Sequence, residues 1–164
     1  MLKKYLLVGL GGFFGAIARY ELGGLFKVGN GGFPAGTFVI NLTGSFVLGL
    51  FLTLLAEKYI LPVEWRLFFA TGFVGAYTTF SSLTNETITL FRQGYWSVGL
   101  LYSVASLAGG MLFAWLGLLA ARQFAFGSFR LTSREQAEIT SREHPVPGLT
   151  GTLPIEELDE LDVG

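Results

Sequence analysis

The chain has 164 residues, of which 51% are hydrophobic and only 14% are charged, and its formal net charge is −1. A soluble domain carries about a quarter charged residues, so this composition is typical of a membrane protein, and the near-zero net charge does not favour a nucleic-acid binder or an acidic-substrate enzyme. With no cysteine and a single histidine, His144, the sequence excludes disulfides, thiol catalysis and zinc sites built on thiolates or histidines.

Four apolar runs are long enough to cross a membrane, because about 20 helical residues span roughly 30 Å of hydrocarbon. The runs are Tyr5–Phe26, Phe33–Ala56, Trp65–Phe91 and Trp96–Phe126. The segments between them are short, which favours neighbouring antiparallel helices. We therefore expect an all-α fold, in which residues 1–126 form one four-span transmembrane helix bundle.

Residues 127–164 differ in character from the rest of the chain. Residues 1–126 hold eight Lys or Arg against four Asp or Glu, whereas residues 127–164 hold three against eight and contain few apolar side chains. A segment of this composition cannot bury enough surface to fold alone. We expect an acidic, disordered tail, with a short helix at Ile155–Leu161 that docks on a partner as the alternative.

The basic residues of the predicted loops are nearly balanced between the two sides of the membrane. With four spans, Lys3, Lys4, Lys58, Arg66 and Arg122 share one side, and Arg19, Lys27 and Arg92 share the other. Cytoplasmic loops normally hold the excess of Lys and Arg, so five against three specifies orientation only weakly. Such a chain can insert both ways round, and two opposite copies can then pair.

The first two spans contain glycines and isolated polar groups. The glycines of residues 9–15 do not have the spacing of a dinucleotide-binding turn, and Gly11 and Gly15 are instead spaced for close helix packing. Arg19 either extends to the interface beside Glu21 or lines a wet vestibule that attracts anions. Asn41 makes a hydrogen bond between helices or presents its amide donors to a passing anion, and the residues alone leave both interpretations open.

The third span contains the most informative polar stretch, which runs from Gly72 to Asn85. Its glycines, threonines and serines are poor helix formers, so the helix can break there. Irregular backbone at that depth needs a bound cation or water to satisfy its carbonyls, unless the hydroxyls bond back to their own helix. Within this stretch Phe80 can present its positive ring edge to an anion.

The fourth span places Tyr102 and Ser106 four residues apart, hence on one helical face. Together with the earlier spans, these motifs resemble those of the CrcB/Fluc fluoride channels. The residues that carry the resemblance are Gly11, Gly12, Gly15, Ala16, Arg19 and Tyr20, then Gly36, Thr37, Asn41, Gly44, Ser45 and Phe46, then Gly72, Phe73, Gly75, Thr78, Thr79, Phe80 and Ser81. The resemblance covers about residues 5–125.

The resemblance implies a dual-topology, antiparallel homodimer in the cell membrane, with two pores and a structural sodium ion on the two-fold axis. It implies that the third helix breaks and that backbone carbonyls, here those of Gly75 and Thr78, hold the sodium. The implied pore, together with the donors found above, consists of Asn41, Phe80, Ser81, Ser82, Tyr102, Ser106 and Arg19. The chain departs from the family at Leu83, where a second phenylalanine is usual, and at Gly110, where a serine is usual. We expect Leu83→Phe to be tolerated or to raise throughput, because it restores the second ring.

Passive export of fluoride is therefore the leading hypothesis, and no enzyme site can be assembled from these residues. A small proton-coupled multidrug-type exporter is the alternative, but it needs a carboxylate at mid-membrane, and Glu21, Glu57, Glu64 and Glu86 are all expected near span ends. A non-transporting membrane scaffold that presents the acidic tail is a third hypothesis.

Overall fold

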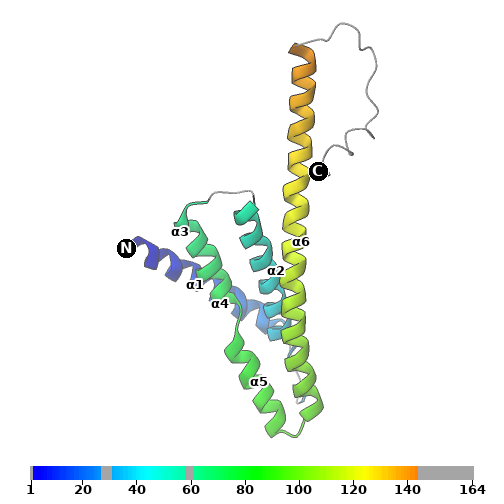
Figure 1. Ribbon diagram of the computed structural model, residues 1–164. Helices are drawn as coiled ribbons and strands as arrows, with labels where there is room; N and C mark the ends of the chain where they lie inside the picture. The colour runs from blue at the N-terminus through cyan, green and yellow to red at the C-terminus, as the bar shows by residue number, and fades with distance from the viewer. Residues whose placement is uncertain (1, 27–30, 58–60, 144–164) are drawn as a thin grey trace. The chain divides into compact units, whose positions relative to one another are not determined.

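The computed structural model describes residues 2–26, 31–57 and 61–143, with residues 124–143 described by their backbone alone, and all regular structure in these ranges is helical (Figure 1). The helices are α1 (Leu2–Gly24), α2 (Ala35–Glu57), α3 (Val63–Arg66), the π-helix η1 (Leu67–Val74), α4 (Gly75–Tyr77), α5 (Phe80–Arg92) and α6 (Trp96–Glu143). The expected all-α class is thus confirmed.

Three helices are long and apolar enough to cross a membrane, namely Leu2–Gly24, Ala35–Glu57 and the Trp96–Gln123 part of α6. They correspond to the first, second and fourth predicted spans. The third predicted span is divided among α3, η1, α4 and α5, and α5 contains only 13 residues. Because it is divided, no single helix in this stretch has the length of a span.

The chain divides into two units, Met1–Phe126 and Gly127–Gly164. The backbone of α6 continues over residues 127–143, and the disorder of the acidic tail stays a prediction. The alternative helix at Ile155–Leu161 lies outside the described residues.

Glycines allow α1 to pack against η1 with the two backbones in contact. A side chain at Gly11 would collide with the carbonyl oxygen of Phe68, and one at Gly15 would collide with the carbonyl oxygen of Phe73. The close helix packing predicted for this glycine pair is therefore confirmed. It brings η1, in the N-terminal half of the third predicted span, against α1.

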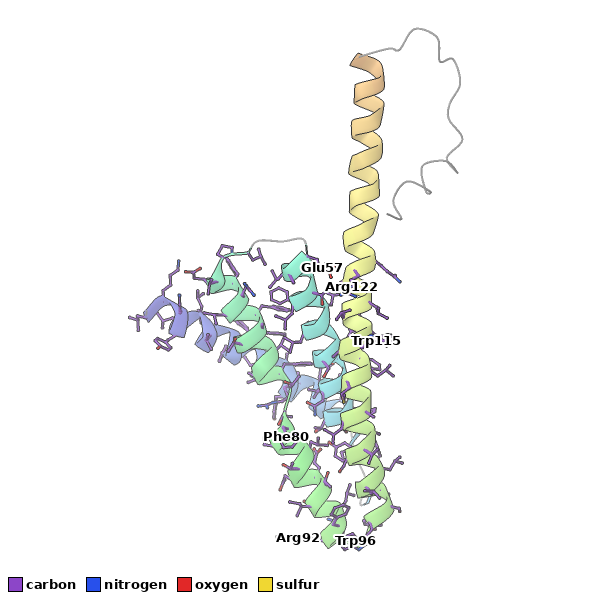
Figure 2. The ribbon with its side chains drawn as sticks, in the orientation of Figure 1. Glu57, Phe80, Arg92, Trp96, Trp115 and Arg122 are labelled. Atoms are coloured by element: carbon purple, nitrogen blue, oxygen red, sulfur yellow. The ribbon has the colours of Figure 1, made fainter. Side chains whose placement is uncertain are left out.

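Helix α2 packs along α6 in the same way, because side chains at Gly49 and Gly117 would meet the backbones of Ala114 and Phe46. At one end of this helix pair, Arg122 Nε donates to Glu57 Oε1 at 3.0 Å (Figure 2). Gly94, with φ 86°, makes the turn between α5 and α6. The core cluster consists of Leu83 and Leu90 on α5 and Tyr102 on α6. Phe33, Phe38 and Val98 pack against it.

Candidate functional site

The third predicted span breaks at Thr78 and Thr79. Helix α4 ends at Tyr77, both threonines have extended backbone, with ψ 154° at Thr78 and φ −148° at Thr79, and α5 begins at Phe80. The Thr79 hydroxyl accepts a hydrogen bond from the Ser82 amide at 3.1 Å and so caps α5. The break predicted from the threonines and serines is confirmed, and Figure 2 shows Phe80 directly after it.

Asn41 on α2 holds the broken backbone. Its Oδ1 accepts from the Thr79 amide at 2.8 Å, and its Nδ2 donates to the Thr79 carbonyl at 3.0 Å. The hydrogen bond between helices, one of the two interpretations of Asn41, is therefore present. A carboxamide has two N–H donors, and the second has no partner among the described residues. Asn41 can thus hold the backbone and still offer a donor.

The carbonyls of Gly75 and Thr78 have lost their usual helical partners. In a continuous helix they would accept from the amides of Thr79 and Ser82. Those amides instead donate to Asn41 Oδ1 and to Thr79 Oγ1. Two carbonyls freed in this way suit a hard cation, which prefers oxygen ligands. Among the described residues, no group of three His, Cys, Asp or Glu side chains could hold a metal ion.

An open groove of about 290 Å³ lies beside the break. It brings together three of the predicted pore residues, Asn41, Phe80 and Ser106, which come from α2, α5 and α6. The Phe80 side chain is 69% exposed. Ser106 is only 6% exposed, and its hydroxyl has no hydrogen-bond partner among the described residues. A buried donor without a partner is costly, so this hydroxyl is available to a polar ligand.

Both departures from the family pattern, Leu83 and Gly110, line this same groove. Leu83 is 6% exposed and belongs to the core cluster. At Gly110, an added Cβ would lie 3.5 Å from Ser45 Oγ, which is an ordinary contact. A larger side chain therefore has room at Gly110 but little room at Leu83.

Tyr102 is completely buried, and its hydroxyl donates to Glu86 Oε2 at 2.6 Å. Thr37 donates to the other oxygen, Glu86 Oε1, at 2.7 Å. The sequence predicts Tyr102 in the pore and Glu86 near a span end. In the structure Glu86 lies between α2, α5 and α6, and its two oxygens accept hydrogen bonds from Thr37 and Tyr102. The run of polar residues from Thr84 to Thr87 was the signal that could have indicated this group.

The remaining predicted residues lie elsewhere. Arg19 and Ser82 line a second open hollow of about 800 Å³, next to Tyr20 and Glu21. The Ser81 hydroxyl lies 3.1 Å from Thr79 Oγ1, and the Ser82 hydroxyl accepts from the same oxygen at 3.1 Å. Three predicted residues thus line the groove, two line the second hollow, and Ser81 and Tyr102 line neither. Both serines belong to the hydrogen-bond network of the break.

The neutral hydrogen-bond donors of the groove, the Asn41 amide and the Ser106 hydroxyl, suit a small anion that must shed its water.

The chain matches the family described as CrcB-like protein, Camphor Resistance (CrcB), over residues 6–118. A relative named Fluoride-specific ion channel FluC, from Acidobacterium capsulatum, is 47% identical over 117 residues, which are 71% of this chain and 94% of the relative. Fluoride-specific ion channel FluC of Koribacter versatilis is 50% identical over 98 residues, 59% of this chain and 78% of the relative.

A third relative, Fluoride-specific ion channel FluC 2 of Moorella thermoacetica, is 48% identical over 120 residues, which cover 71% of this chain and 95% of the relative. The names of these relatives describe ion channels, which are not enzymes. The family match spans most of the part of the chain that contains the three apolar helices. The chain is therefore a multi-pass membrane protein that belongs to the CrcB-like family.

Proposed function

We propose that this chain is a passive, fluoride-selective channel of the cell membrane that lowers cytoplasmic fluoride. The observation that carries the proposal is the groove beside the helix break, where Asn41, Ser106 and Phe80 meet. A dehydrated fluoride ion needs strong hydrogen-bond donors, and the Asn41 amide and the Ser106 hydroxyl are such donors. The edge of the exposed Phe80 ring adds a weak positive potential without a full charge.

Conduction requires an ion to bind and to leave again. Arg19 lies in the other hollow, so the groove itself is lined by neutral side chains. A negative cell interior drives an anion outward by about 2.3 kcal/mol per 100 mV, so export needs no other energy source. HF enters cells uncharged and dissociates in a more neutral cytoplasm, and a fluoride channel relieves this accumulation.

The proposal includes four spans and an antiparallel homodimer with two pores. The third span is then the stretch of residues 63–92, made of two half-helices with the break between them. The near balance of Lys and Arg in the loops supports insertion in both orientations. Many large apolar side chains are exposed along α1, among them Leu10, Phe13, Phe14 and Ile17. They have room to face lipid or a second copy.

A single structural sodium ion between the two copies is part of the proposal. The freed carbonyls of Gly75 and Thr78 are the groups of this chain that would hold it, and two copies would contribute four oxygens. Bound there, the ion would supply a fixed positive charge that satisfies the broken backbone. Asn41 contributes from α2, where its side chain bonds to the backbone of Thr79 at the break.

Fluoride efflux from liposomes that contain the purified protein tests the function. A fluoride electrode should record rapid release when a potassium ionophore balances the charge, whereas chloride-loaded liposomes should retain chloride. Equal release of both anions would refute selectivity. Cysteines placed at each terminus should react from both sides of the membrane, and reaction from one side alone would refute dual topology.

Glu86 is the observation that keeps the proton-coupled exporter in consideration, because a carboxylate held between helices is what such an exporter needs. The two hypotheses differ in what is transported. A channel releases fluoride from loaded liposomes, whereas a proton-coupled multidrug-type exporter releases none and instead moves protons when an organic cation is added. The scaffold hypothesis predicts neither fluoride release nor proton movement.

A further inference from the structure

Tyr77 is the last residue of α4 and directly precedes the break. Its side chain is 9% exposed. The ring stacks on that of Phe73, with centroids 6.1 Å apart and planes within 7°. Packing therefore fixes the ring independently of its hydroxyl.

The Tyr77 hydroxyl bonds across to α2, where it lies 2.9 Å from Thr43 Oγ1. Thr43 Oγ1 also lies 2.8 Å from the Val39 carbonyl and 3.1 Å from the Ile40 carbonyl. A hydroxyl has one hydrogen, and Thr43 uses it on its own helix. Tyr77 is therefore the donor and Thr43 the acceptor of the bond between the helices.

Helix α2 thus holds the broken backbone on both sides. Thr43 holds Tyr77 before the break, and Asn41 holds Thr79 after it. Between these two bonds, a side chain at Gly44 would collide with Thr78 Cγ2 and approach the Tyr77 ring to 3.2 Å. Thr78, whose carbonyl has lost its helical partner, therefore lies between two residues, Tyr77 and Thr79, that are both hydrogen-bonded to α2.

We propose that Tyr77 is a positioning residue, whose hydroxyl bond to Thr43 holds the Gly75 and Thr78 carbonyls in the orientation that a sodium ion requires. The inference rests on the proposed function, because the cation is part of it. Without the bond, the Tyr77 ring stays packed on Phe73, but α4 loses its side-chain hydrogen bond to α2. The carbonyls then sample more directions, and more sodium is needed to fill the site.

Tyr77→Phe tests this inference in the full-length protein, because it keeps the ring and removes only the hydroxyl. Two quantities are measured against sodium concentration, with N-methylglucamine as the replacement cation. They are the rate of fluoride efflux from liposomes and the melting temperature of the detergent-purified protein. We expect the sodium concentration for half-maximal effect to rise roughly three- to tenfold in both, as expected for the loss of one net hydrogen bond.

Thr43→Val should produce the same rise, and the double variant should add nothing further, because both changes remove one bond. Thr43→Ser keeps the hydroxyl and should retain the wild-type sodium requirement. Thr53→Val is the matched control, since Thr53 lies on the same helix and donates to the Gly49 carbonyl at 2.8 Å. It should leave the sodium requirement unchanged.

An unchanged sodium requirement in Tyr77→Phe would overturn the inference, and so would an equal rise in Thr53→Val or additive effects in the double variant. A fall in melting temperature that is the same with and without sodium would also overturn it, because it would show a role in packing alone. A different result would contradict the proposed function. The wild-type protein itself would then release no fluoride, or its efflux and melting temperature would not depend on sodium.

Discussion

The side chain of Asn41 bonds both backbone groups of Thr79, accepting from its amide at 2.8 Å and donating to its carbonyl at 3.0 Å. One side chain on α2 thereby satisfies the Thr79 amide, whose partner in a continuous helix would be the Gly75 carbonyl, and adds a bond to the Thr79 carbonyl. The same carboxamide lines the groove with Phe80 and Ser106. The break and the proposed anion path therefore depend on the same group.

Asn41→Asp should reduce fluoride efflux severely. The carboxylate can still accept from the Thr79 amide, but it loses the donor to the Thr79 carbonyl and repels both that oxygen and an approaching anion. A hydrogen bond to a charged group contributes about 1.5–3 kcal/mol, so the loss of the donor that would face the anion should lower efflux roughly tenfold to a hundredfold, measured with a fluoride electrode.

Asn85→Asp is the matched control, because it makes the same change at an exposed position of α5. It should leave efflux within about twofold of the wild type, because Asn85 does not line the groove. Equal rates in Asn41→Asp and the wild type would contradict the proposed role of the amide.

Ser106→Ala should lower fluoride efflux without lowering stability. The Ser106 hydroxyl has no protein partner among the described residues, so its removal leaves no protein group unsatisfied. If the hydroxyl binds fluoride during passage, its loss should slow efflux by about fivefold to tenfold. Thermal unfolding in detergent and liposome efflux are measured on the same preparation.

Ser103→Ala should give the opposite pattern. Ser103 lies 3.0 Å from the Thr87 hydroxyl and donates to the Gly99 carbonyl, so it joins α5 to α6. Its loss should cost about 1 kcal/mol of stability and leave efflux nearly unchanged. Normal efflux in Ser106→Ala would remove that hydroxyl from the proposed path.

Leu83→Phe should destabilise the protein, contrary to the expectation from the sequence that it would be tolerated. Leu83 is 6% exposed and packs in the core cluster with Leu90 and Tyr102. Inserting a larger side chain into a packed core costs about 1–3 kcal/mol. The midpoint of thermal unfolding should fall, and Ile88→Phe, at a position of α5 that is 51% exposed, should leave it unchanged. An unchanged midpoint in Leu83→Phe would show that the groove accommodates the ring.

Much of the fold could be predicted from composition, because membrane-crossing helices are specified by long apolar runs. Three of the four predicted runs are single apolar helices, and the break was indicated by Thr78, Thr79 and the serines that follow. These are local signals, and they depend on residues that are close in sequence.

The contacts of the candidate site could not be predicted, because they depend on register between distant helices. Asn41 and Thr79 are 38 residues apart, and no pattern in the sequence says which backbone group the amide reaches. The Tyr102 hydroxyl bonds Glu86 for the same kind of reason, since the turn at Gly94 sets α5 against α6. The sequence indicated which side chains are polar, whereas packing decided which of them remain available to an ion.

Gly110→Ser should be tolerated and should not slow fluoride efflux. A Cβ at this position would lie 3.5 Å from Ser45 Oγ, an ordinary contact, and the new hydroxyl would enter the groove one turn beyond Ser106. Serine also replaces a glycine inside α6, which favours the helix by a few tenths of a kcal/mol.

Gly109→Ser is the matched control, because a Cβ there would lie 2.8 Å from Cδ2 of the buried Leu42 side chain. We expect Gly109→Ser to lower the melting temperature and Gly110→Ser to maintain or raise it. A loss of efflux in Gly110→Ser at unchanged stability would show that the groove requires the absence of a side chain at residue 110.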